Sequence, residues 1–117
     1  MGACGTCTVL LDGRPASSCL LFTARLAGRA VVTSEGLGSE HNLSPVQEAF
    51  VKAAGFQCGY CTPGFVLTVE ALLKEHPRPT DEQVREYLAG NLCRCGAYPN
   101  ILKAVRLAAE LRAMAAV

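Results

Sequence analysis

Short apolar runs separated by turn residues predict β-structure near the N-terminus. Residues 8–11 are β-branched or apolar, the Asp-Gly-Arg-Pro run at 12–15 is typical of a turn, and residues 17–21 lead back into apolar sequence. This succession predicts a β-hairpin. A further short strand is expected over residues 29–33, where the sequence reads Arg-Ala-Val-Val-Thr.

A polar, glycine-bearing link follows at residues 34–42 and shows no hydrophobic periodicity. Beyond this link, apolar residues recur at the spacing of a helix. We therefore expect a boundary between two small domains in the link. Residues 1–38 would form the first domain and residues 39–117 the second.

Each helical segment beyond the link carries a start or stop signal. Ser44 with Gln47, and Thr80 with Gln83, can form capping boxes, in which each side chain bonds the other residue's backbone N–H. Glycine and proline mark the helix ends. The first expected helix begins after Ser44 and stops at Gly55, and the second runs from Thr62 to the prolines beyond His76. The third runs from Thr80 to Gly90, and the fourth runs from about Pro99 to Ala115.

The apolar residues of these helices fall on one face each and predict a small helical core. In the last helix we expect an inward stripe with a flank beside it. The stripe comprises Leu102, Val105, Ala109 and the alkyl stem of Arg112, and the flank comprises Ile101, Ala108 and Leu111.

Composition narrows the classes of function. The 117 residues are 50% hydrophobic and 18% charged with a net charge of +1, so no basic field attracts nucleic acid. The apolar runs are shorter than the roughly 20 residues of a membrane helix. No secretory signal pattern opens the chain, and this favours a cytoplasmic, reducing location.

Seven cysteines are the main chemical signal in the sequence. Their odd number and the reducing location argue against a disulfide framework and favour metal ligation. Cys58 and Cys61 fall between the first two expected helices, and Cys93 and Cys95 fall between the last two. Cys61 directly precedes a helix start, where free N–H groups and the helix dipole are expected to stabilise an anionic sulfur.

Four thiolates suit either a [2Fe-2S] cluster or a tetrahedral zinc ion. Zinc sites usually pair two Cys-x2-Cys elements rather than ending in Cys-x-Cys. Near the N-terminus, Cys4, Cys7 and Cys19 match the last three cysteines of the plant-type ferredoxin pattern, Cys-x4-Cys-x2-Cys…Cys, and shift the balance toward iron and sulfide. The first cysteine of that pattern is absent.

Three motifs together resemble a known family. The sequence reads Cys-Gly-Thr-Cys-Thr-Val-Leu-Leu-Asp-Gly over residues 4–13, Gln-Cys-Gly-Tyr-Cys-Thr-Pro-Gly over 57–64, and Gly-Asn-Leu-Cys-Arg-Cys-Gly-Ala-Tyr over 90–98. These segments resemble the iron–sulfur small subunit of molybdenum hydroxylases of the xanthine oxidase family. That family includes xanthine dehydrogenases, aldehyde oxidoreductases and aerobic carbon monoxide dehydrogenases.

The resemblance implies an α+β fold: the remnant of a β-grasp, plant-type ferredoxin-like domain followed by a four-helix-bundle domain. Each domain would hold one [2Fe-2S] cluster. It also implies that Gln57 and Cys95 lie against the pterin of a molybdenum cofactor in a partner subunit. The implied ligands are Cys58, Cys61, Cys93 and Cys95 for the cluster nearer molybdenum, and Cys4, Cys7, Cys19 and one further ligand for the other.

The implied role is electron transfer from the molybdenum centre through the two clusters to FAD or another acceptor. We expect no catalytic residue in the chain, because the sequence holds no nucleophile–base pair and no phosphate-binding loop. The expected partners are a large molybdenum-cofactor subunit, together with an FAD-binding medium subunit. A free-standing ferredoxin-like carrier or sensor is the alternative, and a zinc-stabilised interaction module is a third reading.

The departure from the family lies at the N-terminus. The missing first ligand would precede Cys4 by five positions and therefore lie upstream of Met1. We hypothesise that Met1 is an internal methionine taken for a start, or the end of a fragment. His41 and His76 lie in polar or proline-rich connections, and we assign them no ligand role.

Overall fold

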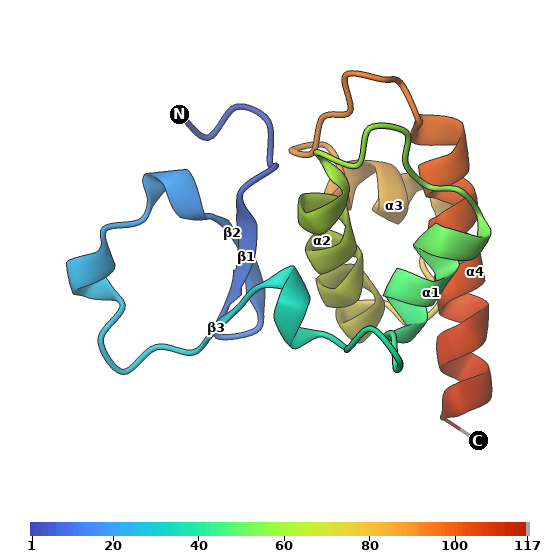
Figure 1. The fold of residues 1–117 in the computed structure, drawn as a ribbon, viewed down its shortest axis with the longest axis horizontal. Helices are drawn as coiled ribbons and strands as arrows, with labels where there is room; N and C mark the ends of the chain where they lie inside the picture. The colour runs from blue at the N-terminus through green and yellow to red at the C-terminus, as the bar shows by residue number, and fades with distance from the viewer. Residues whose placement is uncertain (117) are drawn as a thin grey trace.

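In the computed structural model, which describes residues 1–116, a three-stranded sheet lies beside four α-helices (Figure 1). The predicted mixed α+β organisation is therefore confirmed. The strands β1 (Thr8–Leu11), β2 (Arg14–Ser17) and β3 (Val31–Val32) are antiparallel in the order β2-β1-β3. The helices are α1 (Pro45–Lys52), α2 (Thr62–Glu75), α3 (Asp81–Tyr87) and α4 (Tyr98–Ala115).

The predicted hairpin is confirmed, but its turn is tighter than expected. Asp12 and Gly13 both have positive φ angles, 49° and 82°, which is the backbone of a two-residue hairpin turn. Strand β2 therefore begins at Arg14, inside the segment predicted as a turn. Pro15 is tolerated there because β2 is an edge strand. Residues 18–20 form a 3₁₀ helix instead of continuing the strand.

Both predicted capping boxes are present. The Ser44 hydroxyl accepts from the Gln47 backbone N–H at 3.2 Å, while the Gln47 side chain accepts from the Ser44 N–H at 2.9 Å. Thr80 and Gln83 repeat the same pair of bonds at the start of α3. These bonds satisfy N–H groups that have no partner within the helix.

Helix α1 ends before Gly55, the residue expected to stop it. Ala54 has a φ of 49°, and its N–H donates to the carbonyl of Val51 at 3.2 Å. The Gly55 N–H donates to the carbonyl of Phe50 at 2.9 Å. These two bonds form a Schellman motif, in which an alanine occupies the left-handed position that glycine usually takes.

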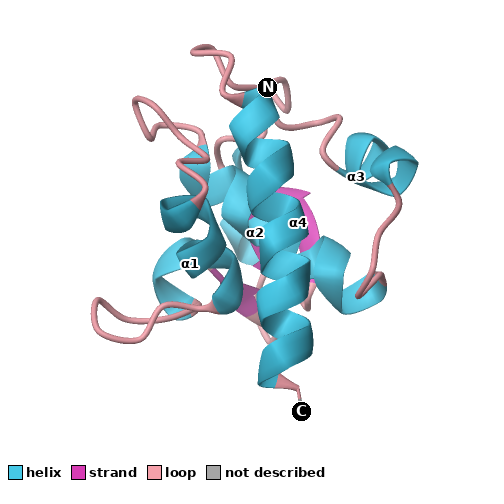
Figure 2. Ribbon diagram, turned by 90° about the vertical axis from the view of Figure 1, so that its right-hand side faces the viewer, coloured by secondary structure: helices cyan, strands magenta, loops and turns pink. Residues whose placement is uncertain are grey.

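Helix α2 is the central element of the core. It packs against β1 on one side and against α1 on the other, and in Figure 2 it lies behind α4. Nine consecutive or near-consecutive residues of α2, from Gly64 to Leu73, are buried. The largest fully buried side chains of the molecule are Phe50, Phe65, Leu67, Leu72, Leu73, Ile101, Val46, Val69 and Val105.

The inward face of α4 differs from the prediction. Ile101 and Ala108, expected on the flank, are buried, whereas Leu102 and Ala109, expected in the stripe, are only half-buried. Of the expected stripe, Val105 alone is fully buried. The difference arises because α4 packs chiefly along α1, which rotates its contact face. The guanidinium of Arg112 donates to Glu70 of α2 at 3.3 Å.

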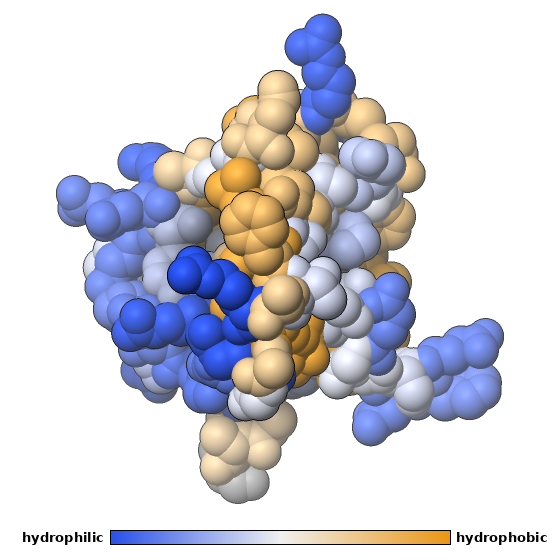
Figure 3. All heavy atoms as spheres, turned by 90° about the vertical axis from the view of Figure 1, so that its left-hand side faces the viewer, coloured by the Kyte–Doolittle hydropathy of each residue, from blue (hydrophilic) through white to orange (hydrophobic). Residues whose placement is uncertain are grey.

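The sheet side of the molecule carries hydrophobic side chains at its surface, which Figure 3 shows as an orange band down this face. Leu20, Phe22 and Val31 are among the exposed large hydrophobic residues. Among residues 1–116, no helix combines the length and the apolar character that crossing a membrane requires.

Candidate metal centre

Segments that are distant in sequence gather their cysteines at one end of the molecule, where the α1–α2 and α3–α4 connections lie together (Figure 1). They enclose a cavity of about 450 Å³. The structure thus brings together Cys4, Cys58, Cys61 and Cys93 around one space, but Cys95 is exposed beside it. The other lining residues are Thr6, Tyr60, Leu92, Arg94 and Tyr98.

The surroundings of Cys61 oppose the predicted stabilisation of its anionic sulfur by the helix start. Cys61 directly precedes α2, yet its side chain makes no capping bond to the helix. Burial raises the pKa of the Cys61 thiol to about 11, and the neighbouring Cys93 contributes to this rise. Desolvation therefore outweighs the helix terminus at this thiol. A bound metal ion would have to displace its proton.

Cys93 is held by its own loop. Burial disfavours the thiolate of Cys93, but the Ala97 backbone N–H donates to Sγ at 3.4 Å and the pKa of Cys93 is lowered. Its backbone N–H donates to the phenol oxygen of Tyr98 at 2.8 Å. The Tyr98 ring packs edge to face on Phe65, with centroids 6.3 Å apart. Tyr98 thus anchors the loop of Cys93 to the core.

The N-terminal cysteines lie among backbone N–H donors. The Cys19 N–H donates to Sγ of Cys7 at 3.4 Å, and this bond lowers the pKa of Cys7 to about 7. The Thr6 backbone N–H lowers the pKa of Cys4 in the same way. Gly2 donates its N–H to Sγ of Cys19 at 3.2 Å. Hydrogen bonds of this kind favour the charged form of a thiol, which is the form that binds metal.

The donor set consists of thiols, with a backbone N–H that points at sulfur. No three His, Cys, Asp or Glu side chains within residues 1–116 converge closely enough to hold one metal ion. The thiols instead surround a cavity with apolar walls, and the N–H groups point at sulfur. Cysteine thiolates and hydrogen bonds to sulfur are features by which proteins hold and tune iron–sulfur clusters.

The sequence analysis singled out some of the residues near the cysteines and missed others. Gln57, predicted to meet a partner's cofactor, is exposed in the loop beside Cys58. Asn91 and Thr68 were missed, although both are buried and hydrogen-bonded beneath the cysteine loops. The only available signal was the position of Asn91 two residues before Cys93, since burial of a polar residue is not visible in a sequence pattern.

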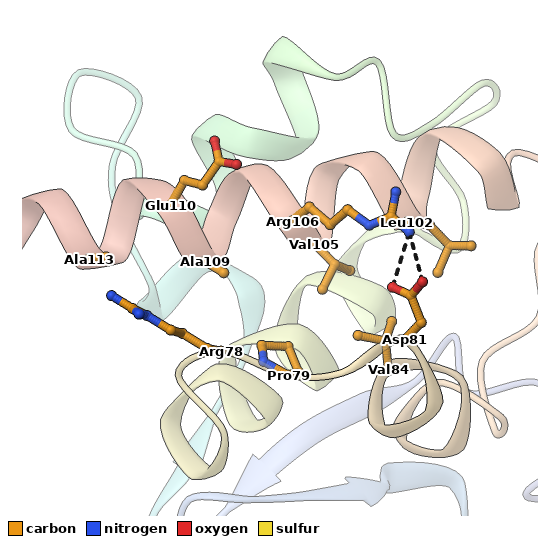
Figure 4. Close-up of a pocket in the computed structure, with 10 residues that line it drawn as sticks. All are labelled: Arg78, Pro79, Asp81, Val84, Leu102, Val105, Arg106, Ala109, Glu110 and Ala113. Carbon is orange, nitrogen blue, oxygen red and sulfur yellow. Dashed lines mark hydrogen bonds and ion pairs between the residues drawn. The ribbon is translucent and has the colours of Figure 1, made fainter.

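A second cavity, of about 340 Å³, lies between α4 and the start of α3 (Figure 4). An ion pair crosses its wall, in which Arg106 donates to both carboxylate oxygens of Asp81 at 3.0 and 3.1 Å. None of its lining residues is a cysteine or a histidine. It is therefore separate from the candidate metal centre.

Comparison with known proteins identifies relatives of this chain. Residues 33–106 match the model of a family described as a [2Fe-2S] binding domain. The chain is 52% identical over 112 residues to one of the subunits of nicotinate dehydrogenase from Pseudomonas putida, covering 96% of this chain and 71% of the relative. It is 46% identical to PaoA of Escherichia coli K12, an aldehyde oxidoreductase iron–sulfur-binding subunit, covering 92% of this chain and 54% of the relative.

Solved structures resemble this chain over 97% of its length. Quinoline 2-oxidoreductase from Pseudomonas putida 86 matches with a TM-score of 0.89 at 40% identity, over 97% of this chain and 72% of that one. The aldehyde oxidoreductase of Desulfovibrio gigas matches with a TM-score of 0.92 at 38% identity, over 97% of this chain and 13% of that one. The chain therefore corresponds to a small part of some relatives and to most of others.

Proposed function

Since the chain belongs to the [2Fe-2S] binding domain family, among the small iron–sulfur subunits of xanthine oxidase family hydroxylases, we propose that it relays single electrons between a molybdenum centre and FAD or another acceptor. The resemblance noted in its three motifs is confirmed at the level of the family. As an iron–sulfur subunit, it is part of an oxidoreductase.

The first proposed cluster lies in the cavity between the helix connections. When bound, a [2Fe-2S] cluster supplies one-electron transfer. The buried Cys61 and Cys93 would hold it on the protein side and the exposed Cys58 and Cys95 on the outer side. The cavity and its apolar walls support this assignment.

The second proposed cluster lies on Cys4, Cys7 and Cys19, with a fourth ligand outside this set. The Cys19 N–H that donates to Cys7 supports it, because this bond favours the Cys7 thiolate. We propose that the sheet with its loops, residues 1–38, is the β-grasp part of the protein. Residues 39–117 would then form the helical cluster-binding domain, of which Val117 lies outside the described residues.

We propose that the cluster end docks on a large subunit that carries the molybdenum cofactor, and that an FAD-binding subunit takes up the electrons. Gln57 and Cys95 are both exposed, as contact with the pterin of that cofactor would require. Tyr60 and Leu92, which lie within three residues of Gln57 and Cys95 in the sequence, are exposed by 76% and 51%. Exposed aromatic residues of this kind are common at protein interfaces.

The proposed electron relay is supported chiefly by the closeness of the two cysteine sets. The Leu92 N–H donates to the carbonyl of Cys4 at 2.9 Å, and the Cys4 side chain lines the same cavity as Cys58 and Cys93. The two cysteine sets are therefore direct neighbours. Two clusters bound in this way would be close enough to exchange electrons without any intervening domain.

Iron and acid-labile sulfide content, with EPR of the dithionite-reduced protein, tests this proposal. The Cys93→Ser variant should lose about two irons per chain, since it removes a ligand of one cluster. Cys7→Ser should lose the iron of the other. His41→Ala, which changes an exposed residue with no assigned role, should keep the full complement.

Two results would contradict the proposal. A colourless wild-type protein that contains zinc in place of iron would indicate a structural metal module. An iron-bearing protein that never copurifies with a large molybdenum subunit, when both are produced together, would favour a free-standing carrier or sensor.

A further inference from the structure

Glycines bring the N-terminal loop and the helices into backbone contact. A Cβ atom on Gly64 would lie 2.2 Å from the carbonyl oxygen of Gly5, and one on Gly5 would lie 2.5 Å from that of Gly90. Gly5 also has a φ of 73°, which residues with side chains rarely adopt. The loop between Cys4 and Cys7 is thus pressed directly on α2 and on the residue before Asn91.

Asn91 closes this contact with hydrogen bonds. Its Nδ2 donates to the carbonyl of Gly5 at 3.2 Å, a bond that joins residues 86 positions apart. Its Oδ1 lies 3.0 Å from the Thr68 hydroxyl oxygen, which shares its single proton between this Oδ1 and the carbonyl of Gly64 at 2.9 Å. Asn91 and Thr68 are only 6% and 3% exposed. Buried amides in such networks hold one geometry because water cannot replace their partners.

We infer that Asn91 is a positioning residue that fixes the loop of Cys4 and Cys7 against the cavity lined by Cys58, Cys61 and Cys93. Its bonds to Gly5 and Thr68 keep the two cysteine sets at one separation. The functional part of this inference rests on the proposed electron relay. The relay needs that separation to stay constant, since electrons must pass between the two sets.

Within residues 1–116, Asn91 supplies the side-chain bond that joins Gly5 to the helical part. The Gly5 carbonyl also accepts from the N–H and hydroxyl of Thr8, at 3.1 and 2.6 Å, but these bonds join the loop to the start of β1 and not to the helices. The Leu92 N–H bonded to Cys4 belongs to the loop that Asn91 begins. Removing the carboxamide should therefore loosen both the Gly5 contact and the Leu92 bond.

Hydrogen exchange of individual amides tests the inference on the purified protein with its bound metal. In Asn91→Ala, the Leu92 amide should exchange about tenfold faster or more, as expected for a lost buried hydrogen bond. Amides in the middle of α2 should keep their rates. Asn100→Ala is the matched control, because Asn100 also donates to a backbone carbonyl at 3.2 Å, that of Ala54, but within the helical part.

Two exchange results would overturn the inference. One is an unchanged Leu92 rate in Asn91→Ala, and the other is an equal rise along α2, which would show general destabilisation. Asn91→Asp serves as the second variant, because it keeps the oxygen that accepts from Thr68 and loses the donor to Gly5. It should raise the Leu92 rate as Asn91→Ala does.

EPR of the reduced protein tests the functional part. In Asn91→Ala the signal of each cluster and the iron content should stay as in wild type, while the magnetic interaction between the clusters changes. An unchanged interaction would overturn the positioning role in the relay. Wild-type protein without iron would overturn the proposed function instead, and the exchange rates would still decide whether Asn91 holds the two loops together.

Discussion

Replacing Gly64 with alanine should separate the N-terminal loop from α2. The new Cβ would lie 2.2 Å from the carbonyl oxygen of Gly5 and 3.2 Å from that of Thr6, and both are backbone atoms that cannot rotate away. Cβ atoms essentially never approach other atoms within 3.0 Å, so the loop that carries Cys4 and Cys7 must move by most of an ångström. The contact between the two cysteine sets opens as a result.

The expected loss of stability follows from two opposing terms. Forcing a methyl group into a packed contact costs about 1–3 kcal/mol. Alanine in place of glycine in a helix returns about 0.5–1 kcal/mol. Because a 2.2 Å approach calls for the upper part of the first range, about 2–3 kcal/mol, we expect a net loss of about 1–2.5 kcal/mol, which corresponds to a fall in melting temperature of about 3–12 °C for a chain of this size.

Thermal unfolding followed by far-UV circular dichroism, under anaerobic conditions, measures this loss. Gly90→Ala is the matched control, because a Cβ on Gly90 meets nothing within 4 Å and its φ is not in the left-handed region. It should melt at or slightly above the wild-type temperature, since alanine reduces the entropy of the unfolded chain. A Gly64→Ala variant as stable as Gly90→Ala would refute the reasoning from close contact.

Three further changes probe separate parts of the structure. Ser44→Ala removes the N-cap of α1 and should cost about 1 kcal/mol, measured as a lower urea midpoint; an unchanged midpoint would show that the cap contributes nothing. The Ala30 N–H donates to the Asp12 carboxylate and lowers its pKa below the ordinary value of 3.8. The Asp12 carboxylate therefore stabilises the fold above about pH 3.8, and this stabilisation is lost as the pH falls through the lower pKa of the folded state. The melting difference between wild type and Asp12→Asn should therefore shrink on acidification below about pH 4, and a constant difference would contradict this. Tyr98→Phe removes the acceptor of the Cys93 N–H and should speed iron loss to a chelator about fivefold or more, whereas a wild-type rate would show that the bond does not hold the loop.

Local features of this protein follow from its sequence alone. The hairpin, both capping boxes and the positions of the four helices depend on interactions between residues a few positions apart, which turn and capping residues encode directly. The placement of Cys58 and Cys61 in one helix connection, and of Cys93 and Cys95 in another, follows from the same helix boundaries. The motifs around these cysteines also indicated the family.

The tertiary structure decided the features that depend on burial and on distant partners. The buried face of α4 is set by its packing against α1, so Ile101 lies in the core and Leu102 at its edge. Burial next to Cys93 raises the pKa of the Cys61 thiol, and this outweighs its place before a helix. The hydrogen bond from Asn91 to Gly5 spans most of the chain. No local pattern specifies such contacts, because they form only when separate elements pack together.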